Sequence, residues 1–347
     1  MERKTVFSGI QPTGEIHIGN YLGAWRNIPR LQDHHDVIAC VVDLHALTVP
    51  RDPARLHEDR LTTAKTLLAV GIDPHRSLLY YQSQVPQHVE LSWILGTLTQ
   101  LGVLNRMTQF KEKANRAGAN LGLYAYPVLM AADILVQRAH LVPVGEDQTQ
   151  HLELSRDLAE RFNSRFGDEF PVPEALIPEV GARIMSLKDP TSKMEKSDPD
   201  ADSRILITDP PHHIARKLRT AVTDSGHEVR YDREEKAGIA NLLEILSLFT
   251  ERPIEDLEEE YHDAPYAKFK EVVAEAVIDG LSPVRASYRE LDDDEVARLM
   301  DKGALDARSQ AERLMASVRS KVGLGPPPPG LASLVFPPPQ AGEGRER

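Results

Sequence analysis

The chain has 347 residues, of which 41% are hydrophobic, and a formal net charge of −12 from 41 basic and 53 acidic side chains. This size predicts one large or two smaller globular domains, and the acidic balance argues against a protein that coats nucleic acid non-specifically. No window is apolar enough for a transmembrane helix, and the N-terminus lacks the apolar core of a signal peptide, so we expect a cytoplasmic protein with no membrane contact. The single cysteine, Cys40, lies in an apolar run typical of a buried strand.

The opening stretch FSGIQPTGEIHIGN, residues 7–20, predicts a short strand, a turn rich in glycine and proline, and the start of a helix. Apolar residues at helical spacing continue this helix to Ile28. A helix N-terminus at the end of a strand presents unpaired N–H groups and positive dipole character, and glycine lets a nucleotide approach the backbone closely. The stretch therefore indicates a phosphate-binding turn.

The next segments alternate between strand and helix patterns. We expect a buried strand over residues 36–48, a helix over 53–71 closed by its final glycine, a strand over 77–84 and a helix over 89–101. This alternation is typical of a doubly wound parallel sheet, in which ligands bind outside the carboxyl ends of the strands.

The segment 106–116, RMTQFKEKANR, is unusually basic for an acidic chain. A solvated helix face is the simpler interpretation, and a phosphate-facing element is the alternative.

Asp133 is the one charged residue in the apolar run 124–136, which predicts a buried helix with Pro127 in its first turn. A lone carboxylate on a buried helix is costly unless it is paired. The sequence leaves two interpretations open, namely an aspartate bonded to a backbone group or a cation, and an acceptor for an N–H group of a ligand.

Residues 141–148 repeat the opening design, with a short strand, a glycine turn and the start of a helix. Acidic residues in such a first turn complement the helix dipole, and here they also stand where a ribose or a metal would bind. The lysines of KMEKS, residues 193–197, lie in a loop between Pro190 and Pro199. The simpler interpretation is that they are mobile surface lysines. The alternative is that they and the opening stretch bind a triphosphate from two sides.

Only helical patterns follow from residue 209 to residue 322, for example over 214–222, 239–249, 266–281 and 293–318. The composition shifts after Ser197, which indicates a domain boundary. Residues 325–347 are rich in proline and glycine and predict a disordered tail.

Over residues 3–324 the chain resembles bacterial tryptophanyl-tRNA synthetases, which are class I enzymes. FSGIQPTG and HIGN are similar to the family opening and its HIGH signature, and KMEKS is similar to its KMSKS signature. MTQFKEK, YPVLMAADIL, VPVGEDQTQH and AVTDS resemble further family blocks in the same order, which disfavours the related tyrosyl-tRNA synthetases. Two features depart from the pattern: Glu195 replaces the usual serine, and a proline-rich tail follows Leu324.

The resemblance implies a Rossmann-like catalytic domain over residues 1–197, in which residues 85–135 lie near the interface of a homodimer. It implies a helical domain over 198–285 that reads the anticodon, and C-terminal helices over 286–324 that pack back on the catalytic domain. The remaining residues, 325–347, would be the disordered tail.

The implied reaction joins L-tryptophan to the terminal adenosine of tRNA(Trp) at the expense of ATP. The tryptophan carboxylate attacks the α-phosphate, and a ribose hydroxyl, the 2′ one in class I enzymes, then attacks the acyl carbon of the adenylate. No protein nucleophile is needed, so the protein positions the substrates and stabilises the charge on the phosphates. Mg²⁺ would bind through the phosphates of ATP rather than through protein ligands.

The resemblance also assigns residues to the nucleotide. The catalytic group would comprise His17, Asn20, Lys193 and Lys196. The wider ATP site would comprise Gln11, Pro12, Thr13, Gly19, Asn20, Lys113, Gly145, Glu146, Asp147, Ile184, Lys193, Met194, Glu195, Lys196 and Ser197.

For tryptophan, the resemblance makes Asp133 the acceptor of the indole N–H. Further contacts would come from Phe7, His45, Tyr126, Met130, Val142, Val144 and Gln148. A site built around a substrate N–H rejects an analogue that lacks it by roughly 10⁴-fold or more. By composition alone, the apolar members of this set are plain core residues, and His45 is a histidine at a strand end.

Two other functions remain as alternatives. A tRNA-independent nucleotidyltransferase of the pantothenate or cytidylyl type shares the HIGH-like signature but lacks the long helical part. The second alternative is a paralogue that keeps the fold but acts as a binding or regulatory partner. Charging of tRNA with tryptophan separates all three.

Overall fold

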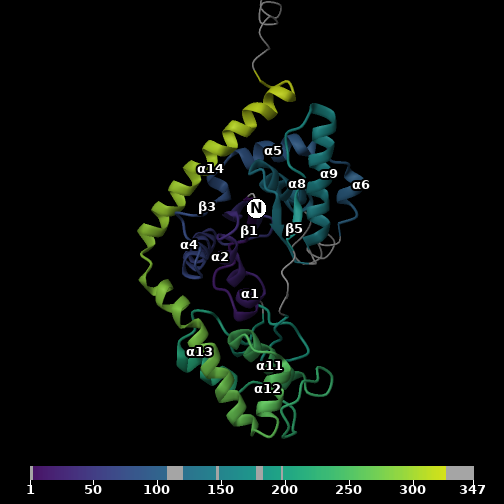
Figure 1. Cartoon of the computed structure of the whole chain (residues 1–347). Helices are drawn as coiled ribbons and strands as arrows, with labels where there is room; N and C mark the ends of the chain where they lie inside the picture. The colour runs from purple at the N-terminus through teal and green to yellow at the C-terminus, as the bar shows by residue number, and fades with distance from the viewer. Residues whose placement is uncertain (1–2, 108–119, 146–147, 177–182, 197, 326–347) are drawn as a thin grey trace, which may run out of the picture.

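The computed structural model describes residues 3–107, 120–145, 148–176, 183–196 and 198–325 (Figure 1). A sheet of five strands lies at its centre, in the order β3-β2-β1-β4-β5, and every pairing between neighbours is parallel. The strands are β1 (Thr5–Ile10), β2 (Asp36–Val41), β3 (Leu78–Tyr81), β4 (Leu141–Pro143) and β5 (Glu174–Leu176). The predicted doubly wound parallel sheet is confirmed, and β5 is a short strand that the sequence did not predict.

The helix predicted from His17 to Ile28 is wrong as a single element. The chain forms α1 (Ile18–Gly23), the 3₁₀ helix η1 (Trp25–Asn27) and α2 (Ile28–Leu31) instead. Ala24 breaks the helix with φ −142° and ψ −54°, outside the helical region. Pro29, in the first turn of α2, has no N–H with which to continue a longer helix.

The strand predicted over residues 36–48 is too long. β2 ends at Val41, and a single helical turn, α3 (Asp43–Ala46), follows. The N–H of Leu44 bonds to the Gln82 side chain at 3.1 Å, and the Asp43 carboxylate accepts hydrogen bonds from Ser83. These side-chain bonds replace the sheet ladder, so the chain turns across the carboxyl edge of the sheet.

Helix α4 (Pro53–Ala69) begins and ends as its sequence predicts. The Asp52 side chain caps it by accepting the N–H of Arg55 at 2.9 Å. Gly71 ends it with φ +107°, and its N–H bonds to the carbonyl of Leu68 at 3.0 Å.

After β3 the described chain continues with five helical segments and the strand β4. They are η2 (Gln82–Gln84), α5 (Gln87–Gly96), α6 (Leu101–Leu104), α8 (Leu121–Val136) and α9 (Thr149–Phe166), with β4 between the last two. Asn120 caps α8 by accepting the N–H of Leu123 at 2.8 Å, so the helix begins earlier than predicted. Pro127 is therefore inside α8 and not in its first turn.

The remaining chain is helical apart from its connections. Its elements are η4 (Ala201–Ser203), α10 (Pro211–Arg219), α11 (Ala237–Thr250), α12 (Ile254–Tyr261), α13 (Tyr266–Glu290) and α14 (Asp293–Lys321). α12 lies within the stretch predicted to be helical but was not among the ranges given, and α13 continues through Pro283 beyond its predicted end. No described helix has the length and apolar character needed to cross a membrane.

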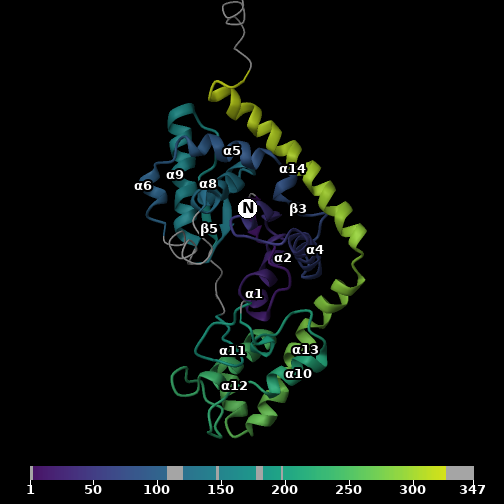
Figure 2. The same ribbon diagram turned by 180° about the vertical axis from the view of Figure 1, so that it is seen from behind.

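Helices α10 to α13 gather below the sheet, and α14 runs from them back along the sheet to its far end (Figures 1 and 2). One apolar core is continuous from the α4 side of the sheet, through Ile18 and Leu67, into the helices at Ile239 and Phe269. A second core lies between the other face of the sheet, α5, α8 and α9, and includes the buried side of α14. The sheet region and helices α10 to α13 therefore share one hydrophobic core.

Helix α14 packs directly on the edge strand β3. Gly303 makes this approach possible, because a Cβ atom there would lie 1.9 Å from the carbonyl oxygen of Leu79. Ion pairs hold the helix at both ends, from Lys65 to Asp293 at 2.7 Å and from Arg319 to Glu90 at 2.6 Å.

We predict that Gly303→Ala lowers the free energy of unfolding by about 1–3 kcal/mol, because the methyl group forces α14 away from β3. Urea unfolding followed by circular dichroism measures this change. Gly96→Ala is the matched control, since Gly96 is also helical and a Cβ atom there has no neighbour within 4 Å. Equal stability of the two variants would contradict the tight contact.

Candidate active site

The HIGN residues are tied to the chain that follows KMEKS. The N–H of Ile18 bonds to the carbonyl of Ile205 at 2.9 Å, and the N–H of Ile207 bonds to the carbonyl of Ile16 at 3.1 Å. His17 lies between these bonds as the N-cap of α1. The turn after β1 and the segment 205–207 therefore form one unit.

The KMEKS residues reach the same place through Ile184. The N–H of Met194 bonds to the carbonyl of Ile184 at 3.0 Å, and both side chains are buried. On the other side, a Cβ atom on Gly19 would lie 3.5 Å from the Cβ of Ile184 and 3.0 Å from Nδ1 of His17. The structure thus brings the two signatures, distant in sequence, into contact at the carboxyl edge of β1.

His17 is a neutral imidazole in a positive environment. It is 4% exposed, and burial together with the charges of Lys196, Arg204 and Lys193 lowers its pKa to about 4. Nδ1 finds no hydrogen-bond partner among the residues that the structure describes. The group is therefore able to hydrogen bond to a phosphate while the lysines supply the charge.

Lys196 is a half-buried cation with no hydrogen bond to its Nζ atom within the described part of the chain. Burial lowers its pKa to about 8; Asp59 and Glu15 oppose this shift, while Arg55 and Arg51 add to it. Lys193 and Glu195 are exposed beside it.

Arg51, two residues before α4, and the N-terminal part of that helix add charged groups that the sequence analysis missed. Arg51 donates to the carbonyl of Pro12 at 3.3 Å, and Asp59 pairs with Arg55 at 3.2 Å. Gly14 has φ +74°, and a Cβ atom there would lie 2.4 Å from Oδ1 of Asp59, so only glycine fits. The doubly wound topology was the available signal, because it brings the start of α4 to the same edge of the sheet.

Asp133 is 1% exposed on α8 and is fully engaged with polar side chains. Its Oδ1 accepts hydrogen bonds from Gln82 Nε2 at 2.6 Å and His88 Nδ1 at 2.7 Å, and its Oδ2 is 2.8 Å from His45 Nε2. Burial alone would raise the pKa of Asp133, but the hydrogen bonds from His45 and His88 hold it below its usual value.

Asp133 is therefore not an unpaired carboxylate. It is paired with side chains, whereas the sequence analysis considered a backbone group or a cation, and its role as an acceptor for a ligand N–H stays a prediction. A carboxylate has about four lone-pair positions, and these three contacts occupy three of them, which leaves one on Oδ2. The sequence analysis did not identify Gln82 and His88 as the partners.

Of the other residues assigned to tryptophan, His45 contacts this carboxylate and Tyr126 contacts His45. The rings of His45 and Tyr126 meet edge to face with centroids 6.1 Å apart. The Tyr126 hydroxyl is 2.8 Å from Nε2 of His151, a buried residue of α9 that the sequence analysis did not assign to the site. Phe7, Val142 and Val144 are buried in the same core, Met130 packs against it, and Gln148 is exposed at the start of α9.

The remaining residues assigned to ATP follow β1 or β4, or lie outside the residues that the structure describes. Gln11, Asn20 and Gly145 are exposed, Thr13 is half-buried and Pro12 is buried. Lys113, Glu146, Asp147 and Ser197 lie outside the described residues, as does most of the predicted tail.

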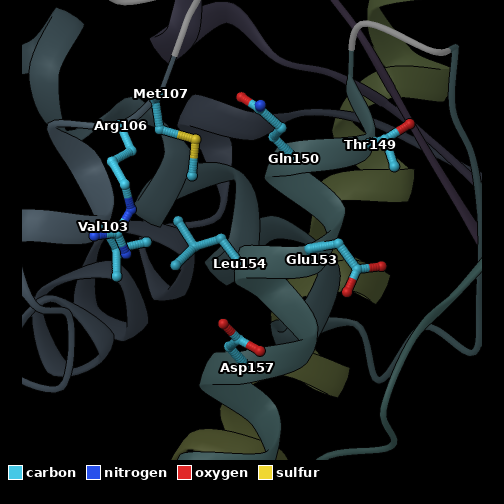
Figure 3. Close-up of a pocket in the computed structure, with 8 residues that line it drawn as sticks. All are labelled: Val103, Arg106, Met107, Thr149, Gln150, Glu153, Leu154 and Asp157. Carbon is cyan, nitrogen blue, oxygen red and sulfur yellow. The ribbon is translucent and has the colours of Figure 1, made fainter.

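A separate open hollow lies between α6 and α9. Figure 3 shows Leu154 reaching from α9 toward Val103 and Met107, with Glu153 and Asp157 along the same helix. None of its lining residues belongs to the constellations above.

Comparisons with known proteins agree with this geometry. The sequence profile of the family described as tRNA synthetases class I (W and Y) matches residues 1–282. The chain is 50% identical over 322 residues to tryptophan–tRNA ligase of Caldanaerobacter subterraneus subsp. tengcongensis, covering 92% of this chain and 98% of that protein. It is 45% identical over 325 residues to tryptophan–tRNA ligase of Bacillus subtilis, with coverage of 93% and 98%.

Solved structures give the same result. Tryptophanyl-tRNA synthetase from Mycoplasma pneumoniae superposes with a TM-score of 0.81 at 34% identity, covering 93% of this chain and 98% of that one. The Campylobacter jejuni enzyme, complexed with ADP and tryptophan, has a TM-score of 0.81 at 34% identity, with coverage of 92% and 100%. The chain therefore belongs to the tryptophanyl and tyrosyl family of class I tRNA synthetases, in which its bacterial relatives are tryptophan–tRNA ligases.

Proposed function

We propose that the chain activates L-tryptophan with ATP and transfers it to tRNA(Trp), the activity that names its bacterial relatives. The observation that carries this proposal is the junction at Ile184, which joins Gly19 of HIGN to Met194 of KMEKS. In support of this, the charges of Lys193 and Lys196 act on the neutral His17 next to this junction. The carboxyl edge of the sheet, where the junction lies, is where a triphosphate binds in a doubly wound fold.

In the activation step, a carboxylate oxygen of tryptophan attacks the α-phosphorus of ATP, and pyrophosphate leaves. His17 would hydrogen bond to a phosphate oxygen, while Lys193 and Lys196 would bind the departing pyrophosphate. Mg²⁺ would arrive with ATP, bound to its phosphate oxygens. The protein then accelerates the step by orienting the two reactants and by stabilising the negative charge that develops.

Asp133 would recognise the indole N–H through Oδ2, with His45 and Tyr126 beside the ring. Phe7, Val142 and Val144 would form apolar walls. Because the carboxylate is already ionised and held by fixed donors, little ordering remains to occur when the ring binds. Tyr126 and Gln148 would lie at the ammonium and carboxylate end of the amino acid.

In the transfer step, a terminal ribose hydroxyl of tRNA attacks the acyl carbon of the adenylate, and AMP leaves. We assign the anticodon contact to the helices after residue 198. The net charge of −12 means that tRNA binding would depend on local basic residues and would weaken steeply with salt.

We further propose a cytoplasmic homodimer. Half of the large apolar side chains that are exposed in the described part of the chain lie on α5, α6 and α8. They are Val89 at 52%, Trp93 at 78%, Leu101 at 67% and Leu121 at 79% exposed. A patch of this kind is typical of a protein interface.

We predict that the protein exchanges pyrophosphate into ATP when L-tryptophan is present and not when L-tyrosine replaces it. Isotope exchange with purified protein measures this, and aminoacylation of tRNA(Trp) tests the second step. Exchange that is equal with the two amino acids would contradict tryptophan activation, and exchange without tRNA charging would favour a tRNA-independent nucleotidyltransferase.

We predict that the affinity for an ATP analogue falls as the pH rises through about 8, because Lys196 loses its proton there in the free protein. Below this pH the ammonium is charged and binds phosphate. Calorimetric titration between pH 7 and pH 9.5 without tryptophan measures the effect. Lys196→Arg should abolish the decline, since arginine stays protonated, whereas Lys193→Arg should retain it. A pH-independent affinity in the unmodified protein would refute the assignment.

We predict that Trp93→Glu yields a monomer in sedimentation velocity experiments, because a buried charge would disrupt the proposed interface. Leu305→Glu is the control. Leu305 is 67% exposed on α14, outside the patch, and its variant should sediment as a dimer. Dimers in both variants would place the interface elsewhere.

A further inference from the structure

Behind Asp133 lies a row of polar side chains that the proposed reaction does not use. His88 and Tyr80 are each 0% exposed, and Gln137 is 6% exposed. They come from α5, β3 and the residue that follows α8. Polar groups buried this deeply are costly unless each finds a partner, so their arrangement calls for a physical explanation.

The hydrogen bonds in this row run in one direction. Gln137 Nε2 donates to the Tyr80 hydroxyl oxygen at 2.8 Å, and that hydroxyl is 3.0 Å from His88 Nε2. The Asp133 carboxylate can only accept from Nδ1 of His88, so Nε2 of the neutral ring is the acceptor and the Tyr80 hydroxyl donates to it. His88 then carries its hydrogen on Nδ1, which donates to Asp133 Oδ1 at 2.7 Å.

A second donor reaches the same carboxylate oxygen. The N–H of Leu44 bonds to Gln82 Oε1 at 3.1 Å, which fixes the orientation of the amide. The Gln82 NH₂ group therefore faces Asp133 and donates to Oδ1 at 2.6 Å. With two fixed donors, Oδ1 has no lone pair left for a ligand.

The other oxygen faces the opposite way. Oδ2 lies 2.8 Å from His45, whose ring meets Tyr126 on the side of the proposed tryptophan contacts. Oδ1 points to the core behind β3, where Tyr80 and the thiol of Cys40 lie together. The two donors to Oδ1 thus set the rotation of the carboxylate and present Oδ2 to the ligand side.

We propose that His88, held by Tyr80 and Gln137, is a positioning residue that orients Asp133 and so determines the preference for a substrate ring that carries an N–H donor. This inference rests on the proposed tryptophan activation. Without His88 the carboxylate loses a charge-assisted bond and is free to rotate, so its acceptor no longer has one fixed direction. Recognition of the ring N–H then weakens, while ATP, which lies away from this row, is bound as before.

The test compares tryptophan with an analogue whose ring nitrogen is replaced by sulfur, β-(benzothiophen-3-yl)alanine. The measured quantity is the ratio of kcat/KM for the two substrates in pyrophosphate exchange. In His88→Leu we expect this ratio to fall about tenfold or more, with an unchanged KM for ATP. His88→Asn should restore most of the ratio, because its amide places a donor near the position of Nδ1.

Because His88 is fully buried, a second pair of variants guards against failure to fold. Tyr80→Phe removes only the hydroxyl that fixes the His88 tautomer, and we expect the ratio to fall about threefold, a smaller loss than when the donor itself is removed. Tyr81→Phe, at the next residue of β3, should leave the ratio unchanged, since its ring contacts Arg60 and is outside the row.

The outcomes separate the two proposals. If the unmodified protein shows no exchange, or does not prefer tryptophan over the analogue, the proposed function or its pocket is wrong. If it discriminates and folded His88→Leu or Tyr80→Phe discriminates equally well, the positioning role is wrong. A loss of kcat/KM that is equal for both substrates would reduce His88 to a purely structural role and would overturn the inference as well.

Discussion

The structure depends on the backbone pairing between residues 16–18 and residues 205–207. A strand turn and a distant loop share hydrogen bonds there, and Ile184 fills the space between Gly19 and Met194. Neither signature alone would form the proposed nucleotide site, because each supplies only part of the charge and part of the close backbone approach. The pairing also explains the electrostatics, since it buries His17 beside cations whose repulsion favours its neutral form.

The second constraint is the ionised Asp133 within an apolar helix. Its burial is tolerated because three side chains from separate elements donate to it. Those donors make the carboxylate part of the permanent structure, not a group that waits unpaired for its ligand. On the proposed function, a ligand N–H would join this existing network, and selectivity would come from the direction of one lone pair.

Much of this architecture was readable from the sequence. Alternating patterns predicted the parallel sheet, and a charge inside an apolar run singled out Asp133. The family resemblance already grouped His45 with it. Gln82 and His88 were not predictable, because they become its neighbours only through the strand order, and a buried histidine carries no sequence signal. The predicted strand at 36–48 was too long because its apolar run continues past the turn at Asp43, where side-chain bonds and not hydrophobicity end the ladder. β5 was not predicted because a largely exposed strand of three residues shows no alternation of apolar and polar side chains.

The course of α14 has a consequence for incomplete chains. β3 is the outermost strand on its side of the sheet, and α14 covers it along the close contact at Gly303. A polypeptide that stops before this helix would contain both signatures and most of the core, yet its uncovered strand would offer free N–H and C=O groups to any other β-strand. Premature termination late in the gene should thus yield an insoluble product instead of a shortened but working synthetase.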